Sequence, residues 1–106
     1  MSSDYQQVFA AARKSADPHF TVLYRPSAAD HPRLGLAISK RRARRAVDRN
    51  RIKRIVRESF REQCSDLGPG DIVVLAGPRA ATAPNARLFD ALARHWHRLR
   101  QDLPQA

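Results

Sequence analysis

The positive charge of this chain is concentrated in residues 40–61, which have the sequence KRRARRAVDRNRIKRIVRESFR. This stretch holds eleven of the 20 Lys and Arg residues and only two acids, Asp48 and Glu58, so its net charge is +9 against +10 for the whole chain. A compact cluster of one sign attracts polyanions and repels other cations. A solvated helix face usually mixes both signs. The charge distribution therefore predicts a surface that binds a polyanion.

The same stretch has the residue spacing of an α-helix, at about 100° per residue. One side collects the residues suited to packing, which are Ile52, Ile55, Val56, Ser59 and Phe60. The adjacent side collects polar and basic residues, which are Asn50, Lys53, Arg54, Arg57 and Arg61. Glu58 lies on a third side, where it can pair with Arg54 one turn earlier. The pattern predicts a helix over about 46–67, ended by the Gly-Pro-Gly of residues 68–70.

Other elements follow from periodicity and from turn residues. We expect helices over 4–12 and from Asn85 onward, and strands over 19–25, 33–39 and 72–76. The order is α-β-β-α-β-α, which predicts an α/β (α+β) two-layer sandwich with three helices and a small mixed sheet. The first two strands are expected to form an antiparallel pair. The third is apolar throughout, which predicts a central strand, and the crossover through the basic helix makes it parallel to a neighbour.

Composition predicts one domain over residues 1–106, because 42% apolar residues supply a single modest core. The one cysteine, Cys64, is expected to be an inert helix residue of a protein in a reducing compartment. No apolar run approaches the roughly 20 residues that cross a bilayer. A cytoplasmic protein is expected. Glu58 and Glu62 argue against a basic helix that lies on a membrane surface.

We expect no catalytic residue and no metal site in the protein itself. The acidic residues are scattered rather than paired as in a two-metal site. His95 and His97 are two residues apart on a helix, so they point about 200° apart and cannot hold one ion. His19 and His31 are expected to be solvated, and Ser39 has no evident base.

The kind of ligand follows from the side chains on the helix. Lys and Arg without Gln suit phosphates and shape rather than base edges, with Asn50 as the exception. Aromatic residues at Tyr5, Phe9, Phe20 and Tyr24 could stack on an unpaired RNA strand, but core packing is the alternative, favoured for Phe9 and Phe20. Trp96 is expected in the core, and Phe60 is expected to pack the basic helix onto the sheet.

Several motifs resemble those of the protein subunit of bacterial ribonuclease P. They are LGLAISK at 34–40, RRARRAV at 41–47, RNRIKR at 49–54 and RESFR at 57–61, with FTVLY at 20–24 and IVVLA at 72–76. An Arg-Asn-Arg alone is a weak signal. The full basic block at this distance from the strand Gly-Leu-x-x-Ser-Lys is highly specific, and the match extends over nearly the whole chain.

This resemblance implies a left-handed crossover through the basic helix, a rare exception to the usual hand. It implies that the partners are a large catalytic RNA and precursor tRNA, whose 5′ leader is removed by endonucleolytic cleavage with Mg²⁺ on the RNA. The chain would then be the accessory subunit of a ribonucleoprotein endoribonuclease, acting as a monomer that requires no protein partner.

The resemblance also implies two groups of site residues. The surface that binds the catalytic RNA comprises Lys40, Arg42, Arg45, Arg49, Asn50, Arg51, Lys53, Arg54, Arg57 and Arg61. The cleft that binds the leader comprises Tyr5, Phe9, Phe20, Val22 and Tyr24. Two features depart from the family pattern. The chain lacks a basic lead-in before Asp4, and RRARRAV stands where many members have a glycine, so the conformation of the 40–46 loop stays open.

Two other classes of protein are consistent with the charge. A ribosome-associated or rRNA-binding module needs the same basic helix but no leader cleft. A helix-turn-helix DNA reader is disfavoured by the strand at 72–76 and by the lack of a short helix paired before the basic one.

Overall fold

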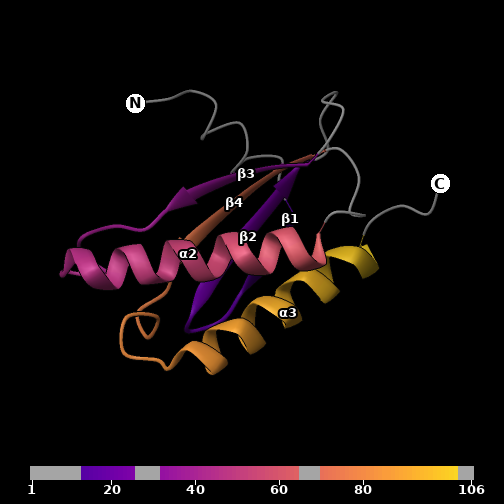
Figure 1. Cartoon of the computed structure of the whole chain (residues 1–106). Coiled ribbons are helices and arrows are strands. Elements are labelled where there is room, and N and C mark those ends of the chain that lie inside the picture. The colour runs from indigo at the N-terminus through magenta and orange to yellow at the C-terminus, as the bar shows by residue number, and fades with distance from the viewer. Residues whose placement is uncertain (1–12, 26–31, 65–69, 103–106) are drawn as a thin grey trace.

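The computed structural model describes residues 13–25, 32–64 and 70–102 (Figure 1). The elements in these ranges are β1 (Arg13–Ala16), β2 (Phe20–Arg25), β3 (Pro32–Ala37), α2 (Ala46–Gln63), β4 (Gly70–Ala76) and α3 (Asn85–Asp102). The four strands form one sheet, and both helices lie on the same face of it. The predicted mixed, two-layer architecture is confirmed. The described part has two helices and four strands, rather than three of each, and the helix expected over 4–12 lies outside it.

The strand order β1-β2-β4-β3 corrects the predicted pairing. β2 and β3 are not neighbours, because β4 lies between them. β4 is antiparallel to β2, with Val22 opposite Val74, and parallel to β3, with Leu36 opposite Val74. An uninterrupted apolar run is best buried on both faces of a sheet and flanked by strands, so β4 takes a central position. Its predicted central place and parallel neighbour are confirmed.

The sequence did not predict β1, because its four residues, RKSA, have no alternating apolar pattern. It pairs with β2 in an antiparallel hairpin with Ser15 opposite Val22. The turn is formed by Asp17, whose Oδ1 accepts hydrogen bonds of 2.8 Å from the backbone N–H groups of His19 and Phe20. A short side-chain acceptor of this kind replaces a backbone acceptor in a tight turn.

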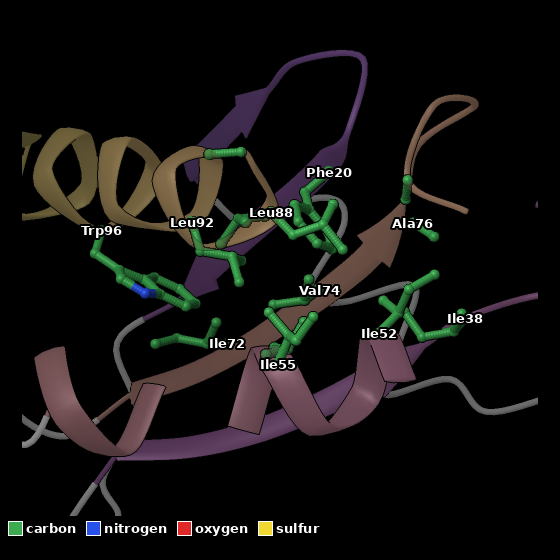
Figure 2. Packing of buried hydrophobic residues seen from close by; sticks show 14 of the residues in the cluster. Phe20, Ile38, Ile52, Ile55, Ile72, Val74, Ala76, Leu88, Leu92 and Trp96 are labelled. Carbon is green, nitrogen blue, oxygen red and sulfur yellow. The ribbon is translucent and has the colours of Figure 1, made fainter. Parts of the chain in front are cut away.

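The core lies between the sheet and the two helices (Figure 2). The predicted packing side of α2 is confirmed, because Ile52, Ile55, Val56 and Ser59 are all buried. Trp96 of α3 is buried as predicted. Its indole Nε1–H donates a hydrogen bond of 2.8 Å to Ser59 Oγ, which joins the two helices.

Phe60 is partly buried, and its ring meets Trp96 edge-on, with centroids 6.1 Å apart. It therefore packs α2 against α3, and it also packs against the core cluster that the helices share with the sheet.

α2 ends a few residues before the predicted end near residue 67. α2 ends at Gln63, where the backbone N–H of the buried Cys64 bonds to the carbonyl of Phe60. At the start of α3, the carbonyl of Pro84 accepts hydrogen bonds from the N–H groups of Arg87 and Leu88. Pro84 thus holds the cap position, and Asn85 is the first helical residue.

Candidate nucleic-acid interface

The basic side of α2 is displayed on the surface as predicted. Asn50, Arg54, Arg57 and Arg61 are exposed, and Lys53 is half-buried. The predicted pair of Arg54 and Glu58 is confirmed, with a distance of 3.4 Å between Nη1 and Oε1. Because 57% of the Arg54 side chain is exposed, the pair contributes little to stability and does not bury the guanidinium.

The loop before α2 adds further exposed cations, namely Lys40, Arg41, Arg42, Arg44 and Arg45. Its conformation, which the sequence left open, is fixed by a buried residue and two side chains. Ala43 is buried, and the N–H of Arg42 meets Ser39 Oγ at 3.2 Å. Arg49 Nη1 donates hydrogen bonds of 2.9 Å to the carbonyls of Ala43 and Arg44. Arg49 thus holds the loop to the first turn of α2, so the basic surface extends from loop to helix.

Arg51 is half-buried, and its guanidinium bonds to the protein. Its Nη1 donates to Asn85 Oδ1 at 2.7 Å and to the carbonyl of Ala83 at 3.2 Å, and its Nη2 donates to the carbonyl of Ala81 at 3.0 Å. These bonds tie α2 to the loop that leads into α3. Arg51, which was predicted to bind RNA, therefore has a structural role in the fold.

A groove of about 780 Å³ lies beside the basic loop and helix, at the end of the sheet where β3 and β4 finish and β2 begins. Its lining includes the side chains of Thr21, Leu23, Ala37 and Leu75 from three strands. Three cations stand around it, Lys14 on β1, Arg42 in the loop and Lys53 on α2, together with one acid, Asp17. An apolar floor with a cationic rim suits a strand whose bases and phosphates face different ways.

The three described residues that were predicted to line the leader cleft do not line the groove. Phe20 and Val22 are fully buried and Tyr24 is 2% exposed, all three in the core on the helix-covered face. Burial raises the pKa of the Tyr24 hydroxyl. The groove is lined instead by Thr21 and Leu23, the alternate residues of β2. Tyr5 and Phe9 lie outside the described residues.

The error is one of strand face, because successive side chains of a strand point to opposite sides. For Phe20 the core alternative is confirmed. The second sheet face also carries an apolar cluster of Leu23 and Val73, with Leu75 partly buried. Both sides of β2 therefore have apolar residues, and periodicity alone could not say which side the helices cover. The small residues Gly35 and Ala37 lie on this second face, opposite Val73 and Leu75.

A polar cluster that the sequence did not reveal lies behind the groove, between β1 and α3. His95 is fully buried, and its Nδ1 lies 2.6 Å from Ser15 Oγ. Its Nε2 lies 3.1 Å from Asp17 Oδ2, at an angle too oblique for a linear hydrogen bond. Arg98 Nη1 donates to Ser15 Oγ at 3.2 Å. The two partners of His95 were missed because they lie about 80 positions away in the chain.

Burial lowers the pKa of His95, and the positive charges of Arg98 and Arg94 lower it further. The negative charge of Asp17 partly offsets this lowering. Burial pushes the pKa of Asp17 upward, but hydrogen bonds from the N–H groups of Phe20 and His19, with the nearby His95, hold it below its usual value. The pair is therefore a neutral imidazole beside an ionised carboxylate.

The other histidines in the described ranges, His19 and His97, have different surroundings. His97 is exposed whereas His95 is buried, which agrees with the prediction that the two point in different directions. His19 is half-buried, with Nδ1 3.9 Å from Asp17 Oδ1, rather than solvated as predicted, and His31 lies outside the described residues. In the described ranges there is no group of three or more His, Cys, Asp or Glu side chains that could hold a metal ion. Neither described helix is long and apolar enough to span a membrane.

A small mixed sheet, a basic crossover helix and a cation-rimmed groove beside it define an α/β nucleic-acid-binding domain. The family model for ribonuclease P matches residues 1–100. The chain belongs to the ribonuclease P protein family.

Relatives and solved structures agree with this assignment. The chain is 54% identical to the ribonuclease P protein component of Thioalkalivibrio sulfidiphilus over 95 residues, which cover 90% of this chain and 79% of that one. It is 48% identical to the component of Nitrosococcus oceani, over 88% of this chain and 78% of that one. The structure is similar to the RNase P protein of Staphylococcus aureus, with a TM-score of 0.81, 30% identity, and coverage of 93% and 90%.

Proposed function

We infer that this chain is the protein subunit of ribonuclease P, and that it assists a catalytic RNA in removing the 5′ leader of precursor tRNA. Membership of the family is the observation that carries this conclusion. The active site lies in the RNA, which also holds the Mg²⁺. The protein contributes affinity and orientation, acting in the cytoplasm as one copy with no other protein required.

The exposed side of α2 and the groove have different tasks in this proposal. The exposed side of α2, with Arg54, Arg57 and Arg61, docks on the phosphates of the catalytic RNA, and the loop residues Lys40, Arg42 and Arg45 extend that surface. Asn50 and Lys53 belong to the same side. Arg49 and Arg51 act indirectly, because their guanidinium groups hold the loops on either side of the helix start.

The groove binds the single-stranded leader. Lys14, Arg42 and Lys53 are spaced around a floor that includes Leu23 and Leu75, which supports a strand with its phosphates toward the rim and its bases toward the floor. Its position next to α2 would place the leader beside the docked catalytic RNA.

The crossover from β3 through α2 to β4 is left-handed in this proposal, as in the family it resembles. In Figure 1 both strands run toward the left, α2 passes in front of the sheet, and β4 lies below β3, which supports this hand. The uncommon connection brings the start of the basic helix to the same end of the sheet as the groove.

Reconstitution with the catalytic RNA tests the function. The protein should restore cleavage of precursor tRNA at a low Mg²⁺ concentration at which the RNA alone is slow, and should raise the affinity for precursor more than for mature tRNA. An rRNA-binding module would bind RNA with similar dependence on salt, but would change neither cleavage nor this preference. That result would exclude the proposed function.

A further inference from the structure

The cluster of His95, Ser15 and Asp17 has the strongest unexplained geometry in the described part of the molecule. A histidine on α3 with no exposed surface meets two side chains of the β1–β2 hairpin, 80 and 78 positions away in the chain. A buried polar group is costly unless its hydrogen bonds are made, so the contacts fix the hairpin against α3.

The other side of the β1–β2 hairpin forms a wall of the groove. Lys14 is adjacent to Ser15 and faces the opposite way, and both Lys14 and Asp17 line the groove. The same turn is held from a second direction, because the N–H of Gly77 bonds to the carbonyl of His19 at 2.7 Å. A Cβ at position 77 would lie 2.4 Å from the Pro18 carbonyl oxygen, so only glycine permits this approach.

We propose that His95 is a positioning residue for substrate binding: by holding Ser15 and Asp17 from behind, it fixes the wall of the groove and sets Lys14 against the leader of the precursor. This inference rests on the proposed function of the groove. It assigns a role in RNA recognition to a buried residue of α3, an element that contributes none of the predicted RNA contacts.

The proton positions in the cluster support one arrangement. Arg98 donates to Ser15 Oγ, so the Ser15 hydroxyl is free to donate to Nδ1 of a neutral His95, whose proton is then on Nε2, facing Asp17. A protonated His95 would carry a proton at Nδ1, so the Ser15 hydroxyl would accept from both Nδ1 and Arg98 and could no longer donate to Nδ1. The Ser15 hydroxyl therefore donates to His95 only while His95 is neutral.

Two other interpretations of the cluster fit less well. A nucleophilic serine needs access to its substrate, but Ser15 is 5% exposed and its Oγ accepts from Arg98. A histidine that only fills the core would not need an acid and a hydroxyl on its two nitrogens. Both partners come from the same hairpin, which indicates that the contact positions that hairpin.

The test is a double-mutant cycle in the holoenzyme assembled from the full chain and the catalytic RNA. The variants are His95→Gln, Lys14→Gln and the two together, with His97→Gln as the matched control on the exposed side of α3. Affinities for precursor tRNA, for mature tRNA and for the catalytic RNA are measured for each. Ser15→Ala, which removes one hydroxyl, carries the same prediction if His95→Gln does not fold.

We expect Lys14→Gln and His95→Gln each to weaken precursor binding by about fivefold and the double variant to be no weaker than either, because they act through one contact. Affinities for mature tRNA and catalytic RNA should stay unchanged. Burial lowers the pKa of His95 in the folded protein, so precursor affinity of the wild type should fall only at a pH below the ordinary histidine range of about 6.5, and His95→Gln should remove that dependence. The groups that face His95 are Asp17 and Ser15 from the hairpin and Arg94 and Arg98 from α3.

Losses that multiply in the double variant would overturn the inference, and so would equal losses for all three RNAs, which would indicate a general structural defect. Unchanged precursor affinity in Lys14→Gln would also overturn it. In that case the reconstitution of precursor cleavage would still decide the proposed function separately.

Discussion

Arg51 and Arg57 stand six residues apart on α2 and face different neighbours. Arg57 is exposed, whereas the guanidinium of Arg51 bonds to two carbonyls and to Asn85. Arg57→Ala should weaken binding to the catalytic RNA by about 1 kcal/mol and change the free energy of unfolding by less than about 0.5 kcal/mol. RNA titration and urea denaturation measure the two quantities.

Arg51→Ala should change the free energy of unfolding rather than RNA binding. Losing its charged hydrogen bonds should lower the free energy of unfolding by about 1 to 3 kcal/mol, because the carbonyls of Ala81 and Ala83 and the Asn85 amide oxygen lose their donor. Urea denaturation measures the loss. A stable Arg51→Ala variant that failed only in RNA binding would show that its guanidinium leaves the protein to contact RNA.

His95 makes the stability of the fold depend on pH. Burial lowers its pKa in the folded protein, so the unfolded chain binds the proton more readily. Its contribution should be complete above about pH 6.5 and should be lost as the pH falls below that value. The lowered pKa of Asp17 extends the loss to still lower pH. Urea denaturation between pH 8 and pH 5 should show a decline that His95→Gln removes and His97→Gln retains.

At the scale of elements, α2 and α3 are joined through one buried hydrogen bond. Ser59→Ala would leave the buried indole N–H of Trp96 without its acceptor, which should lower the free energy of unfolding by about 1 to 2 kcal/mol. Thr82→Ala, in an exposed loop, is the control and should change little. If the two variants were equally stable, the Trp96 contact would not contribute to the helix pairing.

The elements also differ in how far the sequence predicts them. The apolar period of α2 specifies which side packs and which side is basic, because both follow from residues within one helix. β1 has no alternating pattern in its four residues, Arg13–Ala16, so local signals could not find it. β2 pairs with β4, about 50 positions later in the chain. The prediction that β2 pairs with β3, the next strand in the sequence, was therefore wrong.

The residues of the site also differ in how far the sequence predicts them. Exposure of Arg54 and Arg57 follows from helical spacing, but the face of β2 that lines the groove depends on where the helices pack. The contacts of His95 depend on two segments, the β1–β2 hairpin and α3, that meet only in the folded chain. Properties carried by one element were predictable, and those created by the meeting of several were not.

At the scale of the whole molecule, the charge should govern how binding depends on salt. If about six phosphates are contacted, the logarithm of the binding constant should fall against the logarithm of salt concentration with a slope of about −4 to −5. Titrations of the catalytic RNA between low and moderate salt give this slope. A slope near zero would contradict an electrostatic interface.

The central place of β4 has a consequence for synthesis on the ribosome. The chain emerges from its N-terminus, so β2, β3 and the whole of α2 leave the exit tunnel before the strand that joins them. Until Ala76 has emerged, the two parts of the sheet have no hydrogen-bonding strand between them and α2 has no complete surface to pack on. The nascent protein thus presents its cations on an unfinished scaffold, surrounded by ribosomal RNA, and its folding is completed only after translation of the last third of the chain.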